Sequence, residues 1–256
     1  MCKKLIFCGL ISTILVATSC STGYEITSFQ RSRILIDSTY DASPDKAAAA
    51  FIAPYKQRVD SIMSPVVGKA AEYMSADRPE SLLSNLLADI LIWSGKAYGE
   101  QPDFAVYNIG GIRSAFAKGD ITYGDVLDVA PFENKICFVT LTGDKVNELF
   151  SQIAQVGGEG VSHGVELVIT DDGKLKSAKL HGKEIAPDAR YRIATIDYVA
   201  QGNDNMTAFK SSTDVNSPTS GDNNVRQLII KYMKGKMDKG ESVSSRIEGR
   251  IKTEDK

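Results

Sequence analysis

The chain has 256 residues, which is long enough for one large domain with its own hydrophobic core. Its 30 Lys and Arg nearly balance its 32 Asp and Glu, for a formal charge of −2, and removing the two positive charges of Lys3 and Lys4 with a leader would leave −4. This net negative charge argues against a surface that binds polyanions such as nucleic acids.

Residues 1–19 predict a bacterial export signal. Lys3 and Lys4 precede an apolar run over 5–17, and this run is shorter than the roughly 20 apolar residues that a membrane-spanning helix needs. The run ends Leu-Val-Ala-Thr-Ser-Cys, which resembles a lipoprotein signal with cleavage before Cys20 and acylation of its thiol. The alternative is an ordinary signal peptide with an incidental cysteine. We expect an exported bacterial lipoprotein, anchored to a membrane and facing the periplasm.

Only two cysteines remain after the predicted cleavage, Cys20 and Cys137. Cys20 would carry the lipid. Cys137 lies in an apolar stretch, so we expect it to be a buried free thiol. The sequence therefore predicts neither a disulfide framework nor a cysteine-based metal site.

Residues 20–43 are mostly polar and predict a tether between the lipid and a domain that covers 44–256. The short apolar run 34–36 could be a strand within this tether. The domain is expected to begin with a helix over 44–63, because apolar residues recur there at helical spacing. Pro54 inside this stretch predicts a kink or a break of that helix.

A strand over 66–73 is expected next, followed by the strongest helix of the chain over 79–98, whose apolar positions are dense enough for deep burial. Pro79 suits the first position of this helix, and Glu80 favours its positive end. Farther along the chain, we expect strands at 104–107, 136–141, 165–169, 175–180, 192–196 and 245–251, and helices at 123–129, 144–155 and 223–237.

The order of these elements indicates the fold class. The turn Asp171-Asp172-Gly173 predicts that the strands on either side of it form a hairpin. There is no internal repeat, and helices and strands do not alternate regularly. We therefore expect an α+β fold, a single mixed α/β domain of layered helices and sheets, rather than a doubly wound parallel sheet.

The first candidate binding motif is Asn108-Ile-Gly-Gly-Ile-Arg113, directly after the predicted strand 104–107. Gly110 and Gly111 let the backbone approach a ligand closely and adopt conformations closed to other residues. Arg113 can present its planar guanidinium group to a phosphate or a carboxylate. Alone, the same residues are also typical of a turn with a surface salt bridge.

Two later stretches add aromatic and acidic side chains. Phe132 follows a proline and is expected at a loop tip; the alternative is a core phenylalanine that caps a helix. Tyr198 closes the predicted strand 192–196, and Asp204 lies among residues that tolerate left-handed backbone. The alternative for this last stretch is a solvated loop.

Together these stretches resemble the C-terminal domain of the 5′-nucleotidases, the family that includes the UDP-sugar hydrolases and ecto-5′-nucleotidase. The family pattern is Asn-Gly-Gly-Gly-Ile-Arg, Gly-Asp-Ile-Thr/Ser-Tyr, Pro-Phe and Asn-Phe-x-Ala-x-Gly-Gly-Asp-Gly. This chain has Asn-Ile-Gly-Gly-Ile-Arg, Gly-Asp-Ile-Thr-Tyr, Pro-Phe and Asp-Tyr-Val-Ala-Gln-Gly-Asn-Asp-Asn in the same order. The resemblance covers residues 45–252 and implies the fold of that family.

The resemblance also implies a nucleotide-binding site. Phe132 and Tyr198 fall on the two aromatic positions that sandwich the nucleobase, where each stacked ring can contribute about 1–3 kcal/mol. Asp204 falls on the aspartate that binds the ribose hydroxyls, and Asn108 and Arg113 fall on residues that face the sugar and the phosphate. The implied substrate-binding residues are Asn108, Gly110, Gly111, Arg113, Phe132, Tyr198 and Asp204.

Several positions depart from the family pattern. Tyr198 stands where the family has phenylalanine, which keeps the stacking surface and adds a polar tip. Asn203 and Asn205 replace glycines, as asparagine can at positive φ. Ile109 replaces the first glycine of its motif and narrows the approach to a ligand. A family arginine before the long helix has only Arg78 as a counterpart, one position out of register.

The family hydrolyses phosphate esters in a separate N-terminal metallophosphatase domain, with two metals bound by Asp-x-His, Gly-Asn-His-Asp/Glu and later histidines. This chain has only His163 and His181, neither of them in Asp-x-His, and both are expected at the surface. We therefore expect no catalytic residue, metal ligand or cofactor in this chain, and divalent metals on a partner.

The leading hypothesis is the nucleotide-recognition half of an exported 5′-nucleotidase-type phosphohydrolase that acts with a separate metallophosphatase chain in nucleotide catabolism. The alternative is a free-standing exported nucleotide- or nucleoside-binding lipoprotein without catalysis. A third hypothesis is that the domain hydrolyses phosphate esters alone. The sequence leaves open which nucleotide would be preferred.

Overall fold

The computed structural model describes residues 25–254. Contacts divide the described chain into two units, one that ends at residue 51 and one that begins at residue 52. The predicted export signal over 1–19 and the predicted lipidation site Cys20 lie outside the described residues. Within the part of the chain that is described, no helix is long and apolar enough to cross a membrane.

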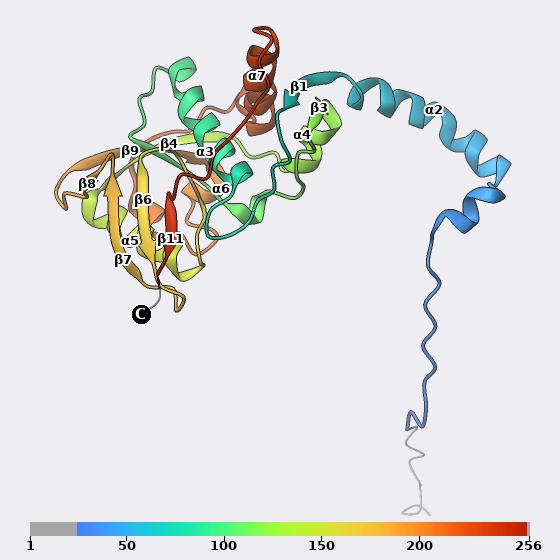
Figure 1. Cartoon of the computed structure of the whole chain (residues 1–256), viewed down its shortest axis with the longest axis horizontal. Helices are drawn as coiled ribbons and strands as arrows, with labels where there is room; N and C mark the ends of the chain where they lie inside the picture. The colour runs from blue at the N-terminus through green and yellow to red at the C-terminus, as the bar shows by residue number, and fades with distance from the viewer. Residues whose placement is uncertain (1–24, 255–256) are drawn as a thin grey trace, which may run out of the picture. The chain divides into compact units, whose positions relative to one another are not determined.

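The first unit is exposed throughout its described part, from residue 25 to residue 51. An irregular extended segment leads into a 3₁₀ helix at Ser38–Ala42 (Figure 1). The apolar run 34–36 forms no strand, so that expectation is wrong. A strand is stable when its backbone pairs with another and one of its faces is buried, and these residues bury nothing.

Helix α2, Lys46–Met63, begins slightly later than expected and ends where predicted. The Asp45 carboxylate accepts the backbone N–H groups of Ala47 and Ala48 at 2.8 and 3.0 Å, which fixes the start of the helix. The helix continues through Pro54 without a break. Because this helix is exposed, water can satisfy the carbonyl group that a proline leaves unpaired.

The second unit is built on a five-stranded sheet with the order β10-β4-β9-β2-β5. Its strands are β2 (Phe104–Tyr107), β4 (Ile136–Thr142), β5 (Gly160–Val161), β9 (Arg190–Ile196) and β10 (Thr213–Asn216). β4 pairs antiparallel with β9, whereas β2 and β9 run parallel. The carboxyl ends of β2 and β9 therefore meet at the same edge of the sheet.

Helices bury the apolar strands of this sheet. α3 (Leu82–Gly95) packs on β2, β5 and β9, and α5 (Gly143–Gln155) packs on β4 and β9. Phe104 of β2 and Phe150 of α5 are fully buried, with their ring centroids 5.3 Å apart. Cys137 of β4 is a free and buried thiol, as expected.

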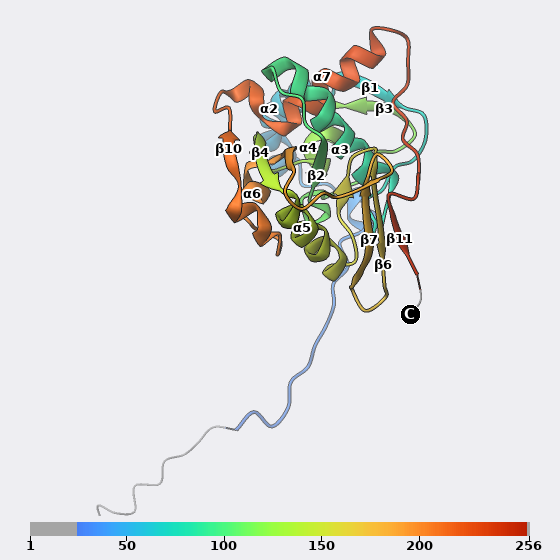
Figure 2. The same cartoon turned by 90° about the vertical axis from the view of Figure 1, so that its left-hand side faces the viewer.

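Two smaller sheets complete the unit. β1 (Val66–Ala70) and β3 (Gly119–Thr122) form an antiparallel pair against α7 (Val225–Met237). β6, β7 and β11 lie side by side in Figure 2, in a sheet ordered β11-β6-β7-β8. These four strands are β6 (Val165–Ile169), β7 (Leu175–Leu180), β8 (Lys183–Glu184) and β11 (Ile251–Thr253), and the short helices are α4 (Tyr123–Val129) and α6 (Asp197–Ala200). The mixture of helices and mixed sheets confirms the predicted α+β class.

Most predicted elements are confirmed within a few residues, and two need correction. The helix expected from Pro79 begins at Leu82, because the Ser84 hydroxyl accepts the backbone N–H of Ser81 at 3.2 Å and so caps the helix there. The strand predicted over 245–251 is wrong except for Ile251, which opens β11.

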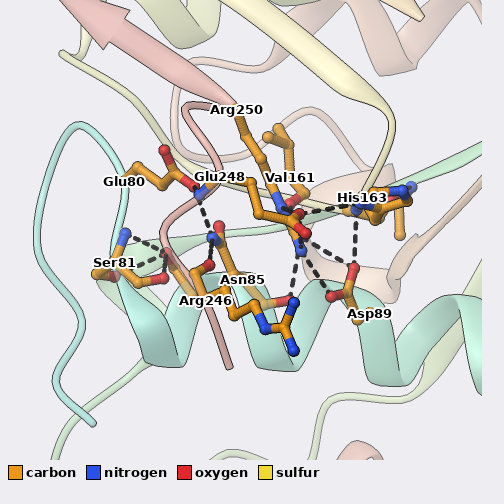
Figure 3. A network of polar contacts seen from close by, with 12 residues as sticks. Glu80, Ser81, Asn85, Asp89, Val161, His163, Arg246, Glu248 and Arg250 are labelled. Carbon is orange, nitrogen blue, oxygen red and sulfur yellow. Dashed lines mark hydrogen bonds and ion pairs between the residues drawn. The ribbon is translucent and has the colours of Figure 1, made fainter. Parts of the chain in front are cut away.

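The reason for the second correction is a polar network that ties the segment before β11 to α3 (Figure 3). Asn85 donates its side-chain amide to the carbonyl of Arg246 at 2.8 Å. The Arg250 guanidinium is nearly fully buried and donates to both Asp89 oxygens at 2.9 and 2.8 Å and to the Val161 carbonyl at 2.8 Å. The backbone of Arg246 and Glu248 therefore pairs with the side chains of Asn85 and Glu80, and pairing with β6 begins only at the Arg250 carbonyl.

Replacing Arg250 with Met is expected to lower the free energy of unfolding by roughly 2–3 kcal/mol, because several charge-assisted hydrogen bonds of a buried guanidinium group are lost. The measurement is urea denaturation. The control is Arg190→Met, since Arg190 pairs with Asp214 at an exposed site and should contribute less than about 1 kcal/mol. Equal losses in the two variants would contradict the structural role of Arg250.

Candidate functional site

The predicted site residues come together at the edge where β2 and β9 end. Asn108 follows β2 directly, and Tyr198 lies one turn beyond β9. Tyr198 does not close the strand, as the sequence predicted, but lies in the short helix α6. Six of the seven predicted residues line one cavity of about 210 Å³, formed by Asn108, Gly110, Gly111, Phe132, Asn134, Tyr198 and Asp204.

The glycine motif forms a 3₁₀ turn at Ile109–Gly111. A Cβ atom on Gly111 would lie 2.7 Å from the Asn108 side-chain oxygen, so a larger residue there would displace the Asn108 side chain. Neither Gly110 nor Gly111 has the positive φ that only glycine adopts freely. The motif therefore needs glycine at position 111 for close packing rather than for an unusual backbone conformation.

Asp204 is the centre of the polar side of the cavity. It accepts the Asn108 side-chain amide at 2.6 Å on one carboxylate oxygen and the Tyr198 hydroxyl at 3.0 Å on the other. Asp204 and Asn205 have φ of +53° and +63°, which confirms left-handed backbone in this loop. The Asp204 carboxylate also raises the pKa of the Tyr198 hydroxyl, because it accepts that proton and because its charge opposes ionisation of the phenol.

Asn108, which lines the cavity, has a buried acceptor without a partner in the described part of the chain. Its side chain is 3% exposed. Because a carboxylate only accepts hydrogen bonds, the Asn108 atom that meets Asp204 must be the amide nitrogen. The remaining atom, Oδ1, is buried and has no hydrogen-bond partner among residues 25–254. A buried acceptor without a donor is costly, so the turn holds an unsatisfied polar atom beside the cavity.

The two aromatic rings of the site are exposed, Phe132 to 46% and Tyr198 to 40%, whereas the phenylalanines of the sheet are buried. The core alternative for Phe132 is therefore wrong. Arg226 of α7 fixes the backbone around Phe132 by donating to the carbonyls of Ala130 and Pro131 at 3.1 and 2.9 Å. This support was not predicted, because it joins residues far apart in the sequence.

Arg113 does not line the cavity but lies beside it. Its guanidinium carbon is 5.7 Å from the centroid of the Phe132 ring, in a cation–π contact. It donates one hydrogen bond, at 3.2 Å, to the Gly110 carbonyl. Most of its donors therefore remain available on the surface next to the ring.

Other residues that the sequence considered lie away from the cavity. Arg78 donates to the Gly158 carbonyl at 2.8 Å and pairs with Glu159. His163 and His181 are both exposed, and His163 lies 3.0 Å from Glu248. Across residues 25–254, no group of three or more His, Cys, Asp and Glu side chains is placed to hold a metal ion.

Comparison with known proteins agrees with the motifs. A family model described as the C-terminal domain of 5′-nucleotidase matches residues 66–211. The chain belongs to this family, which confirms the resemblance seen in the sequence. The match includes the glycine motif, Phe132, Tyr198 and Asp204.

The similar proteins are longer than this chain. Protein UshA of Yersinia enterocolitica is 27% identical over 169 residues, which are 65% of this chain and 31% of that protein. Endonuclease YhcR of Bacillus subtilis is 34% identical over 164 residues, 61% of this chain and 13% of that protein. The structure of the 5′-nucleotidase precursor from Thermus thermophilus matches with a TM-score of 0.69 and 25% identity, over 83% of this chain and 44% of that one. The chain thus spans about a third or less of these curated relatives.

Proposed function

We propose that this chain is the nucleotide-recognition half of an exported 5′-nucleotidase-type phosphohydrolase, and that it acts with a separate metallophosphatase chain in nucleotide catabolism. Membership of the 5′-nucleotidase C-terminal family supports the recognition role. The observation that carries it is the cavity itself, where two exposed rings and a carboxylate converge. Export and a lipid on Cys20 belong to the same proposal and rest on the sequence.

The aromatic side of the cavity suits a nucleobase. Phe132 lines the cavity from a loop and Tyr198 from helix α6, and both keep ring surface exposed. A flat heterocycle between them would remove apolar surface from water on both of its faces. Stacking of this kind tolerates different bases, because every base has a π-face.

The polar side of the cavity suits a ribose. Each Asp204 oxygen already accepts one hydrogen bond, and a carboxylate oxygen has room for a second. A ligand that satisfies these atoms must bring two donors, and the two hydroxyl groups of a ribose do so.

The phosphate is assigned to Arg113, whose guanidinium group lies beside the Phe132 ring. Arg113→Ala is expected to weaken AMP binding by about tenfold and adenosine binding by less than about twofold, because a guanidinium group gains most from a charged partner. Isothermal titration with both ligands measures the ratio. Arg246→Ala, at an exposed arginine in another part of the fold, is the control, and equal losses for both ligands in the Arg113 variant would contradict the assignment.

The proposed function is tested by titrating the purified chain with adenosine and AMP, first alone and then with the candidate metallophosphatase chain. Binding by the chain alone, together with AMP hydrolysis only in the mixture, is the expected result. Binding without hydrolysis in the mixture would favour a free-standing binding protein. Absence of binding to either ligand would overturn the recognition role.

A further inference from the structure

A second carboxylate, Glu159, lies beneath the binding loop. It belongs to the glycine-rich segment Gly157–Gly160 between α5 and β5, and its side chain is only 2% exposed. One carboxylate oxygen accepts the backbone N–H of Ile109, and the other accepts the guanidinium group of Arg78. Arg78 also donates to the Gly158 carbonyl at 2.8 Å, which holds the pair in place.

Stability alone does not account for a charge in this position. Burial raises the pKa of Glu159 even though the Ile109 amide and Arg78 both favour its ionised form, and the nearby Asp204 carboxylate raises it further. Taking a carboxylate out of water is expensive, and a buried ion pair rarely stabilises a fold more than an apolar pair of the same size. The contact with Ile109 therefore calls for a separate explanation.

That contact fixes the peptide group that joins Asn108 to Ile109. Asp204 holds the same loop from the other side, through the side-chain amide of Asn108. Glu159 thus holds the backbone N–H of Ile109 and Asp204 holds the side chain of Asn108, a residue that lines the cavity. Ile109 is itself buried, so the turn is anchored by packing as well as by these bonds.

We propose that Glu159 is a positioning residue for nucleotide recognition: its carboxylate holds the Asn108–Gly111 turn so that Asn108 faces the ligand. The inference rests on the proposed function, because the ligand is the nucleoside assigned to this cavity. Glu159 does not line the cavity and acts through the loop.

The test is Glu159→Gln, which keeps the size of the side chain. A glutamine either turns its NH₂ group towards the Ile109 amide or gives that amide a neutral oxygen in place of a charged one, so the bond to Ile109 is lost or weakened in both orientations. The Arg78 side chain is 39% exposed and can be solvated when it loses its partner. We therefore expect a small change in melting temperature and about tenfold weaker adenosine binding, the fold-change that corresponds to one charge-assisted hydrogen bond.

The control is Glu100→Gln. Glu100 also binds an arginine with both carboxylate oxygens, at 2.8 and 2.6 Å from Arg192, and its side chain is largely buried. It contacts no residue of the cavity. This variant should lower the melting temperature at least as much as Glu159→Gln and leave adenosine binding unchanged.

Amide hydrogen exchange in the ligand-free protein separates this inference from the proposed function. Exchange at Ile109, Gly110 and Gly111 should accelerate in Glu159→Gln and not in Glu100→Gln, whether or not the wild type binds adenosine. Unchanged exchange at these amides overturns the positioning role. Faster exchange with unchanged adenosine affinity also overturns it, because the loop would then be held without consequence for recognition. A wild type that binds neither adenosine nor AMP overturns the proposed function instead.

Discussion

Replacing both Phe132 and Tyr198 by alanine is expected to weaken adenosine binding by more than about 100-fold. By analogy with other base-binding sites, each ring that stacks on a base can contribute roughly 5-fold to more than 100-fold in affinity. Phe132 and Tyr198 are exposed and line one cavity, so neither ring is needed to fill the core. Fluorescence or calorimetric titration of the double variant measures the effect, and circular dichroism verifies that the fold is kept.

Two further variants make this result specific. Tyr73→Ala removes an aromatic ring that is also exposed but does not line the cavity, and it should leave adenosine binding unchanged. Tyr198→Phe keeps the stacking surface and removes only the hydroxyl group that donates to Asp204. It should bind adenosine far better than Tyr198→Ala. If the folded Phe132→Ala/Tyr198→Ala variant bound adenosine with wild-type affinity, the stacking model would be wrong.

The sequence predicted well those elements whose cause is local. The strand Phe104–Tyr107 and the helix Tyr123–Val129 are confirmed at both ends, as is the hairpin around Gly173, whose φ of +76° favours glycine. An apolar run and a turn glycine each determine the structure within a few residues, and Thr122 caps the helix Tyr123–Val129 in the same local way. Their signals can therefore be read without knowledge of the rest of the chain.

The elements that were missed depend on distant partners. β3 and β10 are short, and they are strands only because their backbones pair with β1 and β4. The segment before Ile251 was predicted as a strand, but hydrogen bonds of Asn85 and Arg250 attach it to α3. The spacing of residues within such a segment does not show whether its backbone will pair with a strand or with distant side chains.

The same distinction holds for the candidate site. Family motifs identified Phe132, Tyr198 and Asp204, whereas the supporting residues Arg226 and Glu159 were not predicted. The glycines around Glu159 carried a signal: a Cβ atom on Gly158 would lie 2.4 Å from the Pro79 carbonyl oxygen. Such glycines indicate that two backbone segments pass very close together. They do not indicate that the Glu159 side chain will bind the backbone of the loop at Ile109.

The chain alone is expected to release no phosphate from AMP in the presence of Mn²⁺, Zn²⁺ or Mg²⁺. Two catalytic metals about 4 Å apart need a dense shell of histidine and carboxylate ligands. The chain has two histidines, both exposed, and residues 25–254 contain no group of three or more potential ligands placed around one point. Carboxylates and water can hold magnesium without histidine, so the assay must include that ion.

Addition of a metallophosphatase chain should produce hydrolysis that depends on the cavity of this chain. Asp204→Ala and Arg113→Ala should each reduce the activity of the mixture, because they remove the acceptor assigned to the ribose and the guanidinium group assigned to the phosphate. Turnover by the chain alone near the median enzyme rate of about 10 per second, abolished by either substitution, would refute the split-enzyme proposal. Activity of the chain alone that survives both substitutions would instead identify a contaminating phosphatase, since a genuine reaction at this cavity must depend on the groups that hold its substrate.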